Sequence, residues 1–139
     1  TLLDQVCCAS ADYIAAHGTP ASLAELEHHR AVDYLSASTG KSVPFEFTLG
    51  SRIETRSLAS TVAVNNGDAY VAACEAGFGL IQVPVYHVTR QLEAGTLVEV
   101  LPDFRPPPLP LTVLYPQNRH LSPRVRVFVD WLAELFGKP

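Results

Sequence analysis

The chain has 139 residues, 47% of them apolar and 17% charged, which fits one globular domain or two small lobes with a hydrophobic core. Its net charge of -4 and its scattered basic residues argue against a freestanding nucleic-acid-binding module. No apolar run approaches the roughly 18 residues of a membrane span, and no secretory signal is visible.

The cysteines indicate the cellular compartment of the protein, and the first residues indicate whether the chain is a whole protein or a fragment. Cys7 and Cys8 are adjacent on an expected strand, so their side chains point to opposite faces and do not pair readily. Together with Cys74 they are expected to be buried, reduced thiols of a cytoplasmic protein. The sequence contains no Met and begins in mid-pattern, so we expect an excised fragment of a longer protein, with a processed mature chain as the alternative.

The N-terminal segment predicts a strand followed by two short helices. Residues 2–9 are apolar and β-prone, which favours a strand. Ser10 is placed to cap a helix over residues 11–17. Ser22 and Glu25 have the spacing of a capping box for a second short helix.

Several short strands are expected next. They cover residues 31–35, 45–49, 52–56 and 61–64, with a loop over residues 36–44. The second and third of these strands alternate apolar and polar side chains on either side of Gly50-Ser51, so they predict a hairpin.

The segment from Val64 to Pro84 reads VNNGDAYVAACEAGFGLIQVP and predicts a strand, a helix and a second strand. Its Asn-Asn-Gly-Asp start suits a helix N-terminus. Its Gly-Phe-Gly turn ends the helix and leads into a buried strand over residues 80–83.

The remaining elements continue the alternation of helices and strands. They are a helix over residues 85–93 ended by Gly95, strands over residues 97–101 and 111–115, and a last helix from Ser122-Pro123 to Phe136. Between the two strands, residues 102–110 carry five prolines, which exclude a regular helix or an interior strand. The alternation predicts an α/β fold with parallel components in its sheet.

Catalytic and metal-binding patterns are not visible in the sequence. Gly77-Phe-Gly79 precedes a strand, whereas a dinucleotide-binding loop precedes a helix. His28-His29 has no further ligand at metal spacing, so a solvated helix end is expected there. No Ser lies in a GxSxG pattern. We therefore expect no enzyme activity, no metal and no cofactor, and we favour a binding role.

The central segment also predicts where a ligand would bind. Ligands of open α/β sheets bind outside the carboxyl ends of strands, and helix N-termini attract anions and carbonyl groups. The candidate ligand-binding residues at such ends are Asn65, Asn66, Gly67, Pro84 and Val85. The alternative at this point is that an asparagine here is a helix cap and nothing more.

These residues resemble a known family. The stretch from Val64 to Phe104, followed by LPLTVLYPQNRHLSPRVRVFVDWLAELF and preceded by VCCASADYIAAHGTPASLAELEHHRAVDY, is similar to the effector-binding domain of LysR-type transcriptional regulators. The resemblance covers nearly the whole chain. It implies a bacterial, cytoplasmic, dimeric regulator that binds a small-molecule effector, and that contacts DNA only through an N-terminal helix-turn-helix outside this sequence.

The resemblance also implies a domain organisation. The fold would be like a type 2 periplasmic binding protein, with two α/β lobes joined by two crossover strands. Residues 1–102 would form the second lobe, a mixed sheet flanked by helices, together with the first crossover strand. Residues 103–139 would supply a proline-rich linker, the second crossover strand and the last helix of the first lobe. The effector contacts implied by the family add Ser10 to the candidates above.

Two functions of other classes remain open from the sequence. One is a lobe of an exported solute-binding transport protein, which a signal sequence in the parent gene would favour. The other is an enzyme of the same general fold, which would require measured turnover that depends on Asn66.

Overall fold

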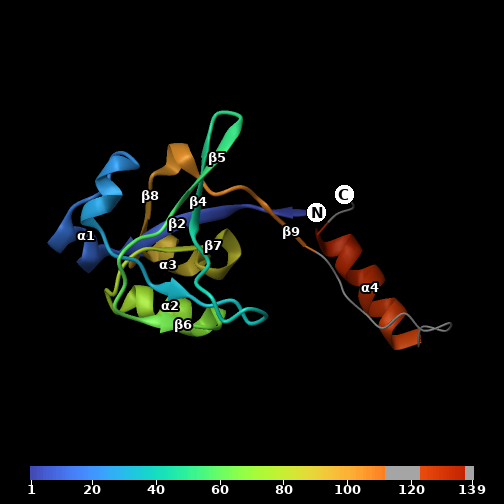
Figure 1. Cartoon of the computed structure of the whole chain (residues 1–139). Helices are drawn as coiled ribbons and strands as arrows, with labels where there is room; N and C mark the ends of the chain where they lie inside the picture. Colours follow the sequence, from blue (N-terminus) through green and yellow to red (C-terminus); the bar gives the residue numbers. More distant parts are fainter. Residues whose placement is uncertain (112–122, 137–139) are drawn as a thin grey trace. The chain divides into compact units, whose positions relative to one another are not determined.

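The computed structural model describes residues 1–111 and 123–136 (Figure 1). The strands are β1 (Leu2–Leu3), β2 (Gln5–Ser10), β3 (Asp33–Tyr34), β4 (Phe45–Leu49), β5 (Arg52–Arg56), β6 (Ala63–Val64), β7 (Ile81–Pro84), β8 (Leu97–Val100) and β9 (Leu109–Pro110). The α-helices are α1 (Ala11–His17), α2 (Gly67–Glu75), α3 (Thr89–Ala94) and α4 (Pro123–Phe136). Short 3-10 helices are η1 (Ala24–His28), η2 (Val85–His87) and η3 (Pro102–Phe104).

The central sheet is mixed. Strand β2 lies between β7 and β8 and runs antiparallel to both. Strand β3 runs parallel to β6 and is joined to the chain before β7 by a parallel bridge between Ala31 and Leu80. The Val32 N–H donates to the Leu80 carbonyl at 3.0 Å, and the Leu80 N–H donates to the Arg30 carbonyl at 2.9 Å. The spatial order is therefore β6-β3-β7-β2-β8, with β6, β3 and β7 parallel, as the alternating pattern predicts.

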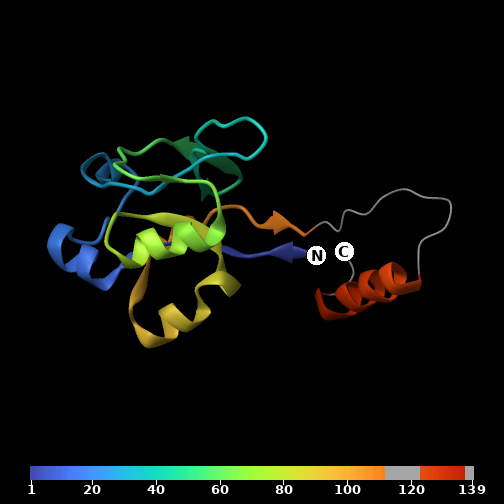
Figure 2. The same ribbon diagram turned by 90° about the horizontal axis from the view of Figure 1, so that it is seen from below.

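The two faces of this sheet carry separate hydrophobic cores (Figure 2). Helices α2 and α3 cover one face, and the β4–β5 hairpin covers the other. Cys7 packs in the core under the hairpin, whereas Cys8 and Cys74 pack in the core under the helices. All three are free, buried thiols, which confirms the expectation from their spacing. Burial is the main cause that raises the pKa of the Cys7 thiol well above its usual value, which keeps it protonated.

The N-terminal segment follows the sequence closely, with two differences. Ser10 caps α1, and its Oγ accepts a hydrogen bond from the Tyr13 N–H at 3.0 Å. The expected strand over residues 2–9 is interrupted at Asp4 and extends to Ser10. The predicted capping box forms only in half, because Glu25 accepts from the Ser22 N–H at 3.2 Å while Ser22 caps nothing.

The hairpin forms as predicted. Strands β4 and β5 pair antiparallel from Phe45 opposite Arg56 to Leu49 opposite Arg52, with the turn at Gly50. Phe45 and Phe47 face the sheet and are buried, and each ring contributes on the order of 2 kcal/mol of hydrophobic stabilisation. The burial of these two rings holds the hairpin against the face of the sheet opposite α2 and α3.

Gly79 permits the close approach of β7 to the segment before β3. Its φ is +134°, and a Cβ atom built there would lie 2.4 Å from the Arg30 carbonyl oxygen and 2.9 Å from the Ala31 nitrogen. Only glycine accepts both that dihedral angle and that contact. The Gly-Phe-Gly turn therefore serves close packing, as the sequence suggested.

The prediction that His28 and His29 form a solvated helix end is wrong for His29, which is buried. His28 is exposed, but His29 has only 6% of its surface accessible. Its Nδ1 lies 2.9 Å from the Tyr13 hydroxyl, whose oxygen also accepts the Arg30 N–H at 3.0 Å. The hydroxyl and Nδ1 share one hydrogen bond, and burial, followed by the charge of His17, lowers the pKa of His29. Sequence spacing missed this contact because its partner lies on another helix.

The proline-rich segment is divided between two compact units. The first unit is Asp4–Pro107, and the second combines Thr1–Leu3 with the described residues from Pro108 onward. Within the first unit, Gln5 Nε2 donates to the Pro107 carbonyl at 2.8 Å, and Arg105 donates to both carboxylate oxygens of Glu99 at 2.7 and 3.0 Å. The unit boundary is thus later than the expected division after residue 102.

The second unit contains a small strand pair and the last helix. Strand β1 pairs antiparallel with β9, and the Leu111 N–H donates to the Thr1 carbonyl at 2.9 Å. Helix α4 starts at Pro123, as the proline predicts. The expected strand over residues 111–115 lies outside the described residues except for Leu111, and so does the expected cap Ser122.

We expect Gly79→Ala to lower the free energy of unfolding by at least about 3 kcal/mol, because strain at positive φ adds to a backbone clash. Gly95→Ala is the control, since Gly95 also has positive φ (+80°) but no atom within 4 Å of the added Cβ. This control should lose only about 1–2 kcal/mol. Urea denaturation of both variants measures the difference, and equal losses would contradict the packing role.

We expect the free energy of unfolding to fall as the pH drops below about 6.5, because the unfolded chain binds a proton at His29 before the folded chain does. The contribution is complete above the unfolded pKa and is lost as the pH falls through the lower folded pKa. His29→Gln should flatten this part of the stability profile, measured by denaturation at a series of pH values.

Candidate functional site at the carboxyl edge of the sheet

The parallel strands β3, β6 and β7 end at one edge of the sheet. Tyr34 lies opposite Val64 at the ends of β3 and β6, and Pro84 ends β7. Strand β2 runs the other way, so its first residue, Gln5, pairs with Pro84 at this edge. The segments that follow β6 and β7 therefore start on either side of the end of β3. They start outside the carboxyl ends of the parallel strands, where ligands of open α/β sheets bind.

Asn66 caps α2, which begins directly after β6. Its Oδ1 accepts the Ala69 N–H at 2.9 Å, and its Nδ2 donates to Asn65 Oδ1 at 3.4 Å. Both asparagines are exposed. Within residues 1–111 and 123–136, the side-chain amide nitrogen of Asn65 donates to no protein group. The helix start thus combines a satisfied cap with free amide donors at an end that favours negative charge.

Gly67 brings the helix start close to the segment after β7. A Cβ atom at Gly67 would lie 3.5 Å from Cε1 of His87. The His87 ring is 4.3 Å, centroid to centroid, from that of Tyr86, which is 62% exposed. The sequence reasoning missed both rings. The available signal was an aromatic residue and a histidine directly after a strand that ends at the ligand-binding edge.

Pro84 and Val85 contribute apolar side chains to the candidate site and no side-chain hydrogen-bond donors. Both are half-buried. The Val85 N–H donates to the Asp4 carbonyl at 2.9 Å, and the Val85 carbonyl accepts from Thr89 Oγ1 at 3.0 Å. Their backbone groups therefore anchor the segment to β2 and α3, and their side chains border the edge next to Gln5.

Ser10 does not join the other candidates. It is 3% exposed, pairs with Leu97, and uses its hydroxyl to cap α1. Gln5 and Ser10 are the two ends of β2, so about 17 Å of strand separates Ser10 from the edge that carries Pro84. The structure places Asn65, Asn66 and Gly67 after β6 and Pro84 and Val85 after β7, at the same edge of the sheet, with Gly67 close to His87. It leaves Ser10 at the opposite edge.

The described part of the chain shows neither a cluster of metal-ligand side chains nor a helix that could span a membrane. No three side chains of His, Cys, Asp or Glu there come together as a set of metal ligands. Each described helix is also too short or too polar to cross a bilayer.

Comparison with known proteins identifies the family of the chain. The family model described as the LysR substrate binding domain matches residues 3–137. The chain belongs to the LysR substrate-binding domain family. This family is the effector-binding regulatory domain of LysR-type transcriptional regulators, so the resemblance inferred from the sequence is confirmed.

Relatives of this LysR substrate-binding domain are named as regulators, not as enzymes. It is 38% identical over 131 residues to the uncharacterized HTH-type transcriptional regulator YhjC of Escherichia coli (strain K12), covering 94% of this chain and 44% of that protein. It is 32% identical over 130 residues to the HTH-type transcriptional repressor PA14_22550 of Pseudomonas aeruginosa (strain UCBPP-PA14), covering 94% and 41%. The chain thus spans less than half the length of these relatives.

The mixed α/β fold also matches LysR regulatory domains of known structure. The regulatory domain of CrgA, a LysR-type transcriptional regulator from Neisseria meningitidis, superposes with a TM-score of 0.80 at 24% identity, over 99% of this chain and 67% of that one. At this identity the likeness concerns the fold alone.

We expect Gly67→Ala to leave the LysR substrate-binding domain as stable as before or up to about 1 kcal/mol more stable, because Gly67 is the first residue of α2 and its φ is not positive. The added methyl group would meet His87 at an ordinary contact distance. Thermal denaturation tests this expectation. A large loss of stability would show that α2 and η2 lie closer together than described.

Proposed function

We propose that this chain is the effector-sensing part of a LysR-type regulator and that a small metabolite binds at the carboxyl edge formed by β3, β6 and β7. The observation that carries the proposal is the contact distance between Gly67, at the start of α2, and His87, in the segment that follows Pro84 and Val85, in a member of this family. The side-chain amides supply hydrogen bonds, and the start of α2 favours a carboxylate or carbonyl group of the effector.

The side chains around this edge support an effector with both a polar and a flat part. Tyr86 offers an exposed ring, and His87 offers an imidazole next to Gly67. The asparagines are neutral, so they select by hydrogen-bond geometry rather than by net charge. Ser10 is not part of this proposed site, because its hydroxyl is committed to α1 at the other edge.

We assign the chain to two lobes of the regulatory domain. Residues 1–102 form the second lobe with the first crossover strand, and residues 103–139 supply the proline-rich linker, the second crossover and the last helix of the first lobe. The antiparallel pairing of β1 with β9 supports this assignment, because crossover strands pass between the lobes side by side. Arg105 and Pro107 belong to the compact unit Asp4–Pro107, so the first part of the proline-rich linker would be held by the second lobe.

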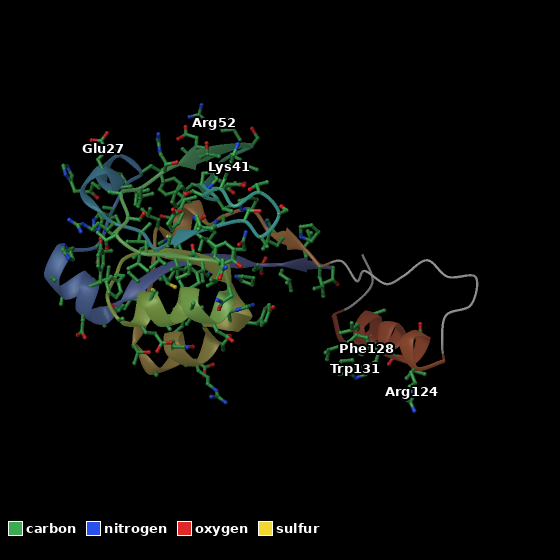
Figure 3. All side chains as sticks on the ribbon, turned by 60° about the horizontal axis from the view of Figure 1, so that its bottom comes forward. Glu27, Lys41, Arg52, Arg124, Phe128 and Trp131 are labelled. Carbon is green, nitrogen blue, oxygen red and sulfur yellow. The ribbon has the colours of Figure 1, made fainter. Side chains whose placement is uncertain are left out.

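Helix α4 carries exposed apolar side chains that another part of the full regulator would bury. Val127, Phe128, Trp131 and Leu135 are between 53% and 67% exposed. The rings of Phe128 and Trp131 lie 6.1 Å apart (Figure 3). In the full regulator, the remainder of the first lobe or a second copy of the chain would bury this face, which agrees with a homo-oligomer.

The effector would act by changing how the lobes close. A ligand held between two lobes stabilises the closed arrangement, which is a hinge motion. DNA contact would come from the helix-turn-helix that the names of the relatives imply, and the regulator would work in the cytoplasm beside its operator. The effector can bias DNA binding only by the difference in its affinity for the open and closed states.

We expect Asn66→Ala to weaken effector binding by the full-length regulator at least about tenfold, because a buried ligand group then loses a hydrogen-bond partner. Calorimetry with the effector found in a metabolite screen measures the affinity. Ser10→Ala is the matched control, since both residues are N-caps and each substitution costs about 1 kcal/mol of stability.

The two variants should therefore lose similar stability but differ in affinity. Full effector affinity in Asn66→Ala, or an equal loss in Ser10→Ala, would refute the proposed site. Loss of operator response without loss of effector affinity would separate signalling from binding.

A further inference from the structure

A second recess lies on the hairpin side of the sheet. It has a volume of about 210 Å³, and all its walls come from the first unit. Its lining combines apolar and charged side chains from β3, from the start of β4, and from the segment after β5: Val32, Asp33, Val43, Phe45, Arg56 and Leu58. None of the residues proposed above to bind the effector lines it.

The position of this recess follows from the alternation along β3. Ala31 belongs to the core under the hairpin and Val32 to the core under the helices, so Asp33 points to the hairpin side. That core ends at Phe45 and Leu58, which also line the recess. A half-buried carboxylate therefore lies where the apolar packing stops.

Two opposite charges line the recess without pairing. Asp33 accepts a hydrogen bond from Ser42 Oγ at 2.6 Å through Oδ2, and no described protein group donates to its Oδ1. Arg56 makes no ion pair with Asp33 among the described residues, although both line the same space. Each charge thus retains capacity for a further partner.

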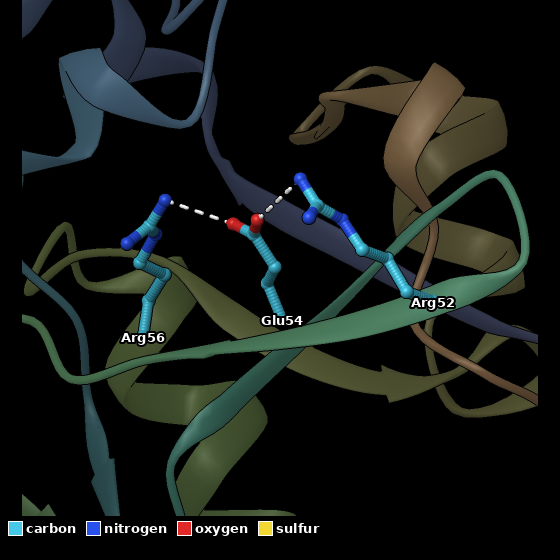
Figure 4. A network of polar contacts seen from close by, with 3 residues as sticks. All are labelled: Arg52, Glu54 and Arg56. Carbon is cyan, nitrogen blue, oxygen red and sulfur yellow. Dashed lines mark hydrogen bonds and ion pairs between the residues drawn. The ribbon is translucent and has the colours of Figure 1, made fainter.

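The Arg56 guanidinium is part of a three-residue network with Glu54 and Arg52 (Figure 4). Its Nη2 bonds to Glu54 Oε2 at 2.9 Å, and Arg52 Nη2 bonds to Glu54 Oε1 at 3.0 Å. Among the described residues, the bond to Glu54 is the one hydrogen bond that the Arg56 side chain makes. The remaining N–H groups of its guanidinium are therefore free to bind a carboxylate. Arg52 shares the same glutamate but does not line the recess.

We propose that this recess binds an α-amino acid with a small apolar side chain, at a site separate from the effector site. The α-carboxylate would bind Arg56, the ammonium group would bind Asp33, and the side chain would contact Phe45 and Leu58. A cavity of about 150 Å³ holds benzene, so about 210 Å³ suits a ligand of about eight to ten heavy atoms. A zwitterion adds a partner to both charges, whereas a plain acid or a plain amine adds a partner to one of them only.

The test uses L-valine as the probe, with isovalerate and isobutylamine as analogues that lack its ammonium and its carboxylate. Binding to the protein is followed by NMR chemical-shift perturbation and calorimetry. We expect L-valine to shift the amide signals around the recess and to bind at least about tenfold more tightly than either analogue. Equal binding of all three compounds, or no binding of L-valine at millimolar concentration, would overturn the proposal.

Substitutions separate this recess from its surroundings. Asp33→Asn and Arg56→Gln should each reduce the affinity for L-valine at least about tenfold. Arg52→Gln is the matched control, because it loses the same kind of bond to Glu54 but should retain L-valine binding. Asn66→Ala should retain it as well, and loss of binding in either control would contradict a separate site. Circular dichroism confirms that each variant is folded.

Discussion

The fold depends on the contact between the Gly-Phe-Gly turn and the chain before β3. At Gly79 the backbone of the incoming strand lies so close to the Arg30 carbonyl that no side chain fits. The hydrogen bonds between Leu80 and its neighbours on that segment then fix β7 parallel to β3. Because β6 pairs with the other side of β3, this one contact determines which strand ends meet at the edge that carries Asn65 and Pro84.

The two faces of the sheet are specialised in different ways. The face under α2 and α3 is a closed apolar core in which Cys8 and Cys74 serve as small hydrophobic groups. The face under the hairpin holds the buried pair of Tyr13 and His29 and ends in the recess beside Asp33. The proposed effector contacts lie at the edge between the faces, and none of them is among the buried residues of either hydrophobic core.

Local signals in the sequence predicted much of this organisation, and non-local contacts limited the rest. The caps at Ser10 and Asn66 follow from residues a few positions apart in the chain, and both are present. The burial of His29 depends on a hydroxyl on another helix, which no spacing rule detects. The proximity of Gly67 to His87 likewise joins segments that only the strand order brings together.

The sequence by itself determined the alternation of strands and helices, the start of α2, the hairpin and the family, because these depend on periodicity, capping and turn residues within short windows. Only the tertiary structure decided which strand ends share an edge, and it placed Ser10 at the far end of β2 from Pro84. The physical reason is that strand order and direction arise from pairing between distant segments. A residue that a family resemblance suggests as an effector contact, such as Ser10, can therefore lie about 17 Å from the other candidate residues.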